Sequence, residues 1–286
     1  MKKIFSAFLS AVFCITGLSV FGLPVSATGG PVIIAFGDSL TAAGVYIKNL
    51  NNQFGTNIIN AGVGGNNTVE GKARFQKDVL SKNPDTVIIC FGMNDSAKDM
   101  AKYVEIEAFK DNLRYFITTL KDRGVHVILA NSNYIEESKY YTRHDKTVFE
   151  PYGGAAAFVD LYCQAVREVA AEQKVPLADV RKACDAYTDR NRITTDGVHC
   201  TDFGYSLYSK AIGEKLADIY RGDVNLDGKV DSIDYLLLKK YLLKNADISA
   251  QHRVFADANK DNKLDAIDYM LIKRHILRNY NIQEGK

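Results

Sequence analysis

The chain has 286 residues and a formal net charge of +2, with 36 lysine or arginine and 34 aspartate or glutamate side chains. This near balance gives no reason to expect nucleic acid or an anionic surface as a partner. The length is enough for more than one domain with a core of its own. The cysteines beyond the first 27 residues are Cys90, Cys163, Cys184 and Cys200.

The first 27 residues have the pattern of a secretory signal peptide. Lys2 and Lys3 precede an apolar run that reaches about Leu23, and residues 25–27 supply a small-residue cleavage site. An uncut run of this length could span a bilayer, so a retained membrane anchor is the alternative. Cleavage would remove the apolar run and so leave no membrane span. It would also leave 34 basic and 34 acidic side chains. Export would permit the remaining cysteines to form disulfides. Four cysteines allow three full pairings, so the pairing stays open.

Residues 28–221 alternate between short apolar runs and amphipathic runs with the period of a helix. Unbroken apolar strands separated by helices indicate a parallel sheet covered by helices on both faces. The sequence therefore predicts one α/β domain that ends in a helix from about Asp202 to Tyr220. The expected strands are Val32–Phe36, Asn57–Ile59, Thr86–Phe91, Val125–Ala130 and Val175–Ala178.

Four short polar blocks stand at the ends of expected strands or before the last helix, where an open parallel sheet gathers its sites. The first strand runs into a GDSL block with Ser39, and the second into a glycine-rich bend with Gly65. The third strand ends in GMND with Asn94, and a DGVH block with Asp196 and His199 precedes the last helix. Each block alone is also typical of an ordinary turn or helix cap.

In this order and context, the blocks resemble those of the GDSL or SGNH hydrolase family, over residues 32 to about 220. The resemblance implies a flavodoxin-like, three-layer α/β/α fold and ester hydrolysis without a catalytic cofactor. Ser39 would be the nucleophile, His199 the base, and Asp196 the group that holds the imidazole tautomer. The oxyanion would be bound by the backbone N–H groups of Ser39 and Gly65 and by the side-chain amide of Asn94.

The segment of residues 134–152 is long for a loop and rich in tyrosine, which favours a functional role. Its aromatic rings would form either a platform for sugar rings or a self-packed surface loop, and the sequence does not decide between them. His144 in this segment is a second histidine of interest. His126 alternates with apolar residues in a strand, so we expect it to pack in the core.

Residues 222–286 contain a twelve-residue acidic loop written twice, each followed by an apolar run of helical period. Oxygen-bearing side chains at positions 1, 3, 5, 9 and 12, with a backbone carbonyl at position 7, are spaced to surround one calcium ion. Two solvated acidic turns are the alternative. The expected ligands are Asp223, Asn225, Asp227, the Lys229 carbonyl, Asp231 and Asp234, then Asp257, Asn259, Asp261, the Lys263 carbonyl, Asp265 and Asp268.

Aspartate at position 12, with no dedicated helix entering either loop, disfavours a calcium-sensing EF-hand. The region from Gly222 to about Tyr280 resembles a type I dockerin, the module that plugs enzymes into the cohesin repeats of a cellulosome scaffold. The resemblance implies two structural calcium ions, a small all-α fold and a cohesin partner bound in either of two orientations. The recognition residues would be Ser232, Ile233, Lys239 and Lys240, and in the second copy Ala266, Ile267, Lys273 and Arg274.

Two departures from the dockerin pattern carry their own expectations. Asn262 stands at position 6 of the second loop, where the first has Gly228, so we expect weaker calcium binding there. No linker rich in Pro, Ser or Thr separates the last helix from Gly222, which predicts limited swing between the domains.

Together the two regions predict a secreted, extracellular esterase attached to a cellulosome. Ester groups on plant cell-wall polysaccharides are chiefly acetyl, so the expected substrate is xylan or another acetylated wall polysaccharide. The fold alone does not name the substrate. The alternatives are a lipid esterase or thioesterase on the same scaffold, and an inactive adaptor that binds carbohydrate.

Overall fold

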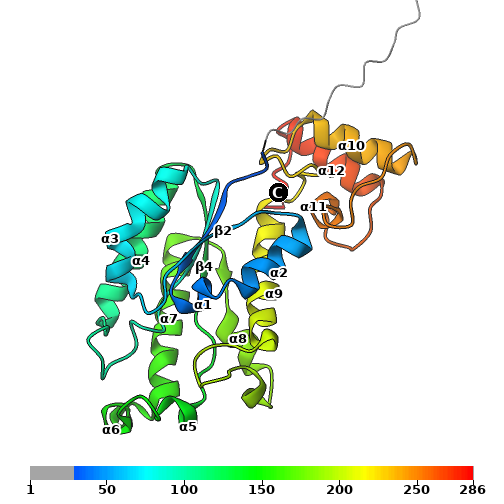
Figure 1. Ribbon diagram of the computed structural model, residues 1–286. Coiled ribbons are helices and arrows are strands. Elements are labelled where there is room, and N and C mark those ends of the chain that lie inside the picture. Colours follow the sequence, from blue (N-terminus) through cyan, green and yellow to red (C-terminus); the bar gives the residue numbers. More distant parts are fainter. Residues whose placement is uncertain (1–28, 286) are drawn as a thin grey trace, which may run out of the picture.

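The computed structural model describes residues 29–285 and shows a three-layer α/β/α domain with a smaller helical module at its C-terminal end (Figure 1). The predicted signal peptide lies outside the described residues. Within them, no helix is both long and apolar enough to cross a membrane.

The centre of the larger domain is a sheet of five parallel strands in the order β2-β1-β3-β4-β5. β1 and β3 are buried along their whole length, as their apolar sequences predict, whereas β2 lies at an edge and is partly exposed. The parallel fold class is confirmed. The strands are β1 (Ile33–Gly37), β2 (Ile59–Gly62), β3 (Thr86–Cys90), β4 (His126–Ala130) and β5 (Leu177–Ala178).

Two strand details differ from the sequence-based expectation. β2 starts at Ile59, because the side chain of Asn51 accepts the Ile58 N–H at 2.9 Å and the Thr56 hydroxyl at 3.0 Å, which ties residues 56–58 to the preceding helix. The expectation that His126 packs in the core is wrong: His126 is the exposed first residue of β4, and burial begins with Val127.

Helices cover both faces of the sheet (Figure 1). On one face α9 packs against α2 and α8, and on the other α4 packs against α3 and α7. The spacing of apolar residues explains this, since α4 buries Phe109, Leu113, Phe116 and Leu120 at intervals of three or four. The helices are α2 (Val45–Phe54), α8 (Val180–Asp185) and α9 (Asp202–Ile219), then α3 (Thr68–Asp78), α4 (Ile106–Lys121) and α7 (Ala155–Gln173).

Short helices and 3₁₀ turns complete the domain at its loops. They are α1 (Ser39–Ala42), α5 (Glu137–Tyr140), α6 (Lys146–Phe149), η1 (Leu80–Lys82), η2 (Glu150–Tyr152) and η3 (Arg190–Arg192).

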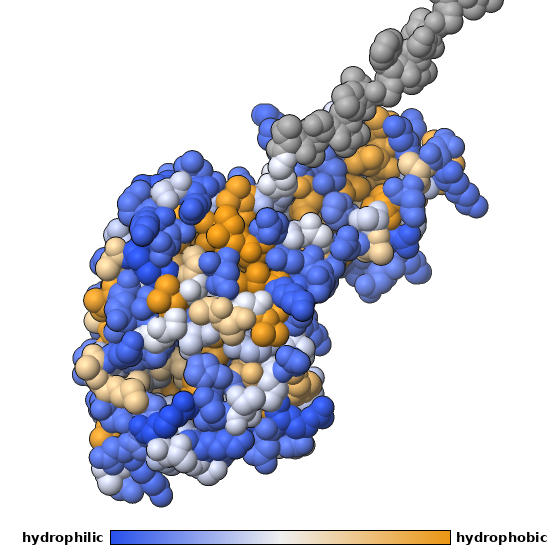
Figure 2. All heavy atoms as spheres, in the orientation of Figure 1, coloured by the Kyte–Doolittle hydropathy of each residue, from blue (hydrophilic) through white to orange (hydrophobic). Residues whose placement is uncertain are grey.

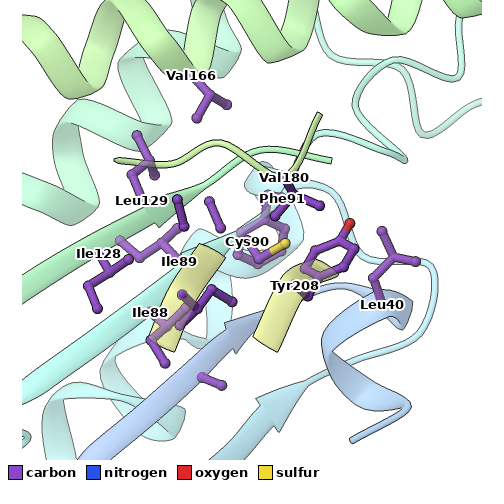
Figure 3. Close-up of a cluster of buried hydrophobic side chains, with 14 of the residues drawn as sticks. Leu40, Ile88, Ile89, Cys90, Phe91, Ile128, Leu129, Val166, Val180 and Tyr208 are labelled. Carbon is purple, nitrogen blue, oxygen red and sulfur yellow. The ribbon is translucent and has the colours of Figure 1, made fainter. Parts of the chain in front are cut away.

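The hydrophobic core of the larger domain lies along β3 and its neighbour β4. Ile88, Ile89 and Cys90 of β3 pack beside Leu129 and the ring of Tyr208 from α9 (Figure 3). Burial raises the pKa of the Cys90 thiol well above its usual range, so this thiol is inert packing. The structure contains no disulfide within the described residues, and the buried free thiols are Cys90, Cys163, Cys184 and Cys200.

The C-terminal module is built on two helices, α10 (Ser232–Leu242) and α12 (Ala266–Ile276), which follow the two acidic loops and pack against each other. Leu238 and Ile272, at equivalent positions of the repeat, are fully buried in a separate small core. In contrast to our expectation, one helical turn, α11 (Arg253–Ala256), does enter the second loop.

α11 holds the module against the larger domain. Phe255 is 1% exposed and its ring lies 5.4 Å from that of Phe54 in α2 and 6.4 Å from that of Tyr220. The Phe255 carbonyl accepts the Gly222 N–H at 2.7 Å, and Tyr220 in turn bonds Thr86 at the start of β3. The module therefore sits at the amino ends of the strands, and the limited swing that the missing linker predicts stays a prediction. The exact boundary at residues 221 and 222 stays a prediction.

We expect Phe255→Ala to lower the free energy of unfolding of the full chain by about 3 kcal/mol, because it leaves a cavity between the two cores. Urea denaturation measures this. The matched control is Val254→Ala, since Val254 is 41% exposed. Equal effects of the two substitutions would show that the contact contributes nothing to stability.

Candidate active site

The candidate site lies where the order of the strands reverses. The chain passes from β1 to β2 on one side and then to β3 on the other side of β1, and the candidate residues follow the carboxyl ends of β1 and β3, where open parallel sheets gather their sites. Ser39 follows β1 as the first residue of α1, and Asn94 follows β3. The side chain of Asp38 caps α1 by accepting the Leu40 N–H at 2.9 Å.

Three predicted residues from distant parts of the chain form one hydrogen-bonded series. His199 Nε2 lies 3.0 Å from Ser39 Oγ, and His199 Nδ1 lies 2.8 Å from Asp196 Oδ2. The other carboxylate oxygen of Asp196 accepts the backbone N–H groups of Val198 at 3.0 Å and His199 at 2.7 Å. A nucleophile, a base and a group that orients the base are arranged in this way when a hydroxyl is activated for attack.

The electrostatics of Asp196 suit the orienting role. Burial by itself raises the pKa of this carboxyl, but the hydrogen bonds from the ring and backbone of His199 and from the Val198 N–H outweigh burial and hold the pKa well below its usual range. The carboxylate therefore stays ionised at neutral pH.

The structure also brings Asn94 to the glycine-rich bend that contains Gly65. One N–H of the Asn94 amide donates to the Asn66 carbonyl at 3.0 Å, which leaves its second N–H for another acceptor. Lys102 Nζ donates to the Gly65 carbonyl. The neighbouring Asp95 accepts both the N–H and the hydroxyl of Thr68, at 2.9 and 2.5 Å, and so fastens the end of the bend to the loop after β3 that carries Asn94. The oxyanion roles stay predictions.

Arg74 of α3 is a supporting residue that our sequence reasoning missed. Its guanidinium donates to the carbonyls of Gly37 at 2.8 Å and Ala61 at 2.7 Å, and to Asn66 Oδ1 at 2.7 Å. It thereby ties the ends of β1 and β2 to the glycine-rich bend. An arginine within an amphipathic helix carries no sequence signal of such a role.

Two buried carboxyl groups, Asp38 and Asp95, flank the candidate residues and were also missed. Burial raises the pKa of Asp38 to about 7, with a further increase from the charge of Asp95. Burial raises the pKa of Asp95 to about 6. One oxygen of each has no hydrogen-bond partner among the described residues. Adjacency to Ser39 and Asn94 was the only available signal.

The tyrosine-rich segment of residues 134–152 is packed on itself, which supports the surface-loop alternative over a sugar platform. Tyr140 and Phe149 are buried, and the imidazole of His144 stacks on the Tyr140 ring with a centroid distance of 3.8 Å. Tyr152, 41% exposed, is the only ring of the described segment with a large free surface. Most of these rings are therefore unavailable to a carbohydrate.

The first acidic loop contains buried carboxyl groups that suit a bound cation. Asp223 and Asp234 of the first loop are buried, and burial, with the charge of Asp234 acting on Asp223, raises their pKa values to about 7 and about 6. A bound cation would offset both effects. In the described residues no three His, Cys, Asp or Glu side chains are grouped closely enough to hold a metal. The oxygen atoms of the loop suit calcium, and the identity of the residues that bind the ion stays a prediction.

The second loop has the same backbone path as the first. The N–H of Asn262 donates to Asp257 Oδ2 at 2.8 Å, as that of Gly228 does to Asp223 Oδ2 at 2.8 Å. Asn262 adopts a left-handed φ of 64°, where Gly228 has 91°. Because this conformation costs more for asparagine than for glycine, weaker binding at the second loop remains our expectation.

The predicted recognition residues lie on equivalent faces of α10 and α12. Ile233 is 43% exposed and Ile267 is 46% exposed, and Figure 2 shows apolar side chains at the surface of this module. Neither face is covered by the α/β domain. The exposed residues are Ser232, Ile233, Lys239, Lys240, Ala266, Ile267, Lys273 and Arg274.

Comparison with known families gives two matches. The profile of the GDSL-like Lipase/Acylhydrolase family matches residues 35–207, and that of the Dockerin type I domain matches residues 221–277.

Individual proteins agree with these matches. The chain is 33% identical to uncharacterized lipoprotein YqeF of Bacillus subtilis, over 63% of this chain and 87% of that protein. It is 24% identical to an acetylxylan esterase of Geobacillus stearothermophilus, over 56% of this chain and 71% of that protein. Among solved structures, a lipase/acylhydrolase from Enterococcus faecalis has a TM-score of 0.56 and 26% identity, covering 65% of this chain and 95% of its own.

The raised pKa values of Asp38 and Asp95 predict a pH dependence of stability. An unfolded aspartate titrates near 3.8, so these groups contribute stability that is fully present below about pH 4 and is lost as the pH rises through about 6 to 7. We expect Asp38→Asn to reduce the loss of free energy of unfolding between pH 5 and pH 8 by about 2 kcal/mol.

Urea denaturation at the two pH values measures the effect, and the exposed Asp189→Asn is the control. An unchanged pH dependence in Asp38→Asn would mean that the carboxyl is ionised in the folded protein throughout this range.

Proposed function

Because the chain belongs to the GDSL-like lipase/acylhydrolase family and carries a type I dockerin domain, we propose that it is a secreted, cellulosomal carbohydrate esterase. Its substrate is an O-acetylated plant cell-wall polysaccharide such as xylan. The observation that carries the proposal is the series from Ser39 through His199 to Asp196 in a chain that also has a docking module.

The reaction begins with attack of Ser39 Oγ on the acetyl carbonyl, while His199 Nε2 takes the hydroxyl proton. The charge that develops on the carbonyl oxygen is bound by the N–H groups of Ser39 and Gly65 and by the Asn94 amide. His199 then gives its proton to the departing sugar oxygen, which leaves an acetyl group on Ser39. Water, deprotonated by His199, attacks this acyl-enzyme, and His199 returns the proton to Ser39 Oγ as acetate is released.

Asp196 contributes by keeping the proton of His199 on Nδ1, so that Nε2 is free to accept. Its hydrogen bonds to two backbone N–H groups keep it ionised and fixed during the reaction. The negative charge stabilises the imidazolium that forms in each half of the reaction.

Two observations support the choice of substrate. The chain resembles an acetylxylan esterase at 24% identity, and its dockerin implies a cohesin partner and attachment to a cellulosome. A lipase or thioesterase would instead prefer long acyl chains. Comparison of nitrophenyl acetate with nitrophenyl palmitate separates these two classes of substrate.

Ser39→Ala removes the attacking oxygen, so we expect acetate release from acetylated xylan to fall by at least about 10³-fold. Acetate is measured after incubation with acetylated xylan, pectin and glucomannan. Binding to a cohesin module, which depends on the other end of the chain, should not change. Absence of acetate release by the wild-type protein from all three polymers would refute the proposed substrate class.

We further propose that two calcium ions stabilise the dockerin, with the ligands predicted above. Removal of calcium with EDTA leaves several carboxylates unbalanced in each loop, so we expect cohesin binding to be lost. Hydrolysis of nitrophenyl acetate should be retained, because the candidate site lies at the opposite end of the sheet. Calorimetry with a cohesin module measures the binding.

Calcium, but not an equal concentration of magnesium, should restore cohesin binding. Binding that survives EDTA would contradict the structural role of the ions. Loss of esterase activity together with binding would instead mean that the two domains unfold as one unit.

A further inference from the structure

A basic side chain of the tyrosine-rich segment, Arg143, reaches the residue that orients the base. Its Nη1 lies 3.1 Å from Asp196 Oδ2, the same oxygen that faces His199, and its Nη2 donates to the Asp196 carbonyl at 3.0 Å. The guanidinium therefore holds Asp196 by its side chain and by its backbone. A planar guanidinium with two parallel donors restricts rotation at such a site more than a single ammonium does.

The segment that carries Arg143 is packed directly on the loop of residues 196–199. The Glu136 N–H donates to the Gly197 carbonyl at 3.0 Å. Gly197 has a φ of 91°, and a Cβ added there would lie 2.8 Å from the Glu136 carbonyl oxygen and 2.8 Å from the Tyr140 nitrogen. Only glycine allows this approach, so the loop and the segment are fitted to each other.

The adjacent residue, His144, fixes the segment from its other side. His144 Nδ1 lies 2.7 Å from Asp99 Oδ1, and the Asp145 N–H donates to Asp99 Oδ2 at 2.9 Å. The side chains of His144 and Asp99 are 9% and 10% exposed. Asp99 belongs to the loop that starts at Asn94. Consecutive residues of one segment thus join the loop of the proposed base to the loop of a proposed oxyanion donor.

We infer that Arg143 is a positioning residue, which holds Asp196 in the orientation that keeps the imidazole of His199 aimed at Ser39. The inference rests on the proposed function, because the orientation of Asp196 affects the reaction only if His199 acts as the base. Arg143 acts through Asp196 and has no role in binding the substrate. Its 43% exposed side chain limits the strength of the pair.

The test is a double-mutant cycle on nitrophenyl acetate hydrolysis. We expect Arg143→Met to lower kcat by about 3- to 5-fold with KM unchanged. In an Asp196→Asn background the same substitution should change kcat by less than about 2-fold, because the partner of Arg143 has already been altered. Arg143→Lys, which keeps the charge and one donor, should retain more of the wild-type kcat than Arg143→Met.

Lys146→Met is the matched control, since it removes a positive charge from an exposed position of the same segment and should leave kcat unchanged. An equal loss of kcat from Arg143→Met in both backgrounds would overturn the inference, as would an unchanged kcat or an effect on KM alone. If Arg143→Met does not fold, Arg143→Gln takes its place, and a wild-type kcat in that variant would overturn the inference equally.

The rate of labelling of Ser39 by a fluorophosphonate probe separates this inference from the proposed function. Labelling of the wild type with a slower rate in Arg143→Met supports both. Equal rates would refute the role of Arg143 alone. A wild-type protein that is not labelled would refute both.

Discussion

The constraint on which the rest of the structure depends is the reversal of strand order between β1 and β3 in a fully parallel sheet. Parallel strands end at the same edge, and a reversal leaves their carboxyl ends uncovered by connecting helices. Ser39 and Asn94 are therefore neighbours in space although 54 residues of chain separate them. The glycine-rich bend after β2 and the loop before α9 converge on the same edge. One topological feature thus assembles all four polar blocks.

The residues around the candidate site are held mainly by polar contacts to the backbone. Arg74 binds the carbonyls at the ends of β1 and β2, Asp95 binds the bend through Thr68, and Arg143 binds Asp196. Such contacts fix direction more sharply than apolar packing does, which suits a site that depends on hydrogen-bond geometry. The buried carboxyls Asp38 and Asp95 are the cost of this arrangement, because burial opposes their charge.

The sequence predicts the parallel sheet, since β1 and β3 are buried and apolar throughout. That His199 and Asp196 meet Ser39 is implied by the resemblance to the hydrolase family rather than by the strand ends, because their block precedes α9 and follows no strand directly. The sequence does not predict contacts in which one side chain from a distant part of the chain holds a residue of the candidate site. Arg143 meets Asp196 across 53 residues, and no pattern near Arg143 indicates this contact. The turn α11 is missed because four residues are too few for a helical period, and its burial comes from the other domain through Phe255. His126 is misplaced because a strand pattern does not reveal which residue begins the pairing.

The attachment of the helical module at the amino ends of the strands fixes where Ser39 lies relative to helices α10 and α12. Through Phe255 and Tyr220 the module packs against the end of the sheet that lies farthest from Ser39. A partner bound to the exposed faces of α10 or α12 would therefore lie beyond the amino ends of the strands, and Ser39, at their carboxyl ends, would face away from that partner.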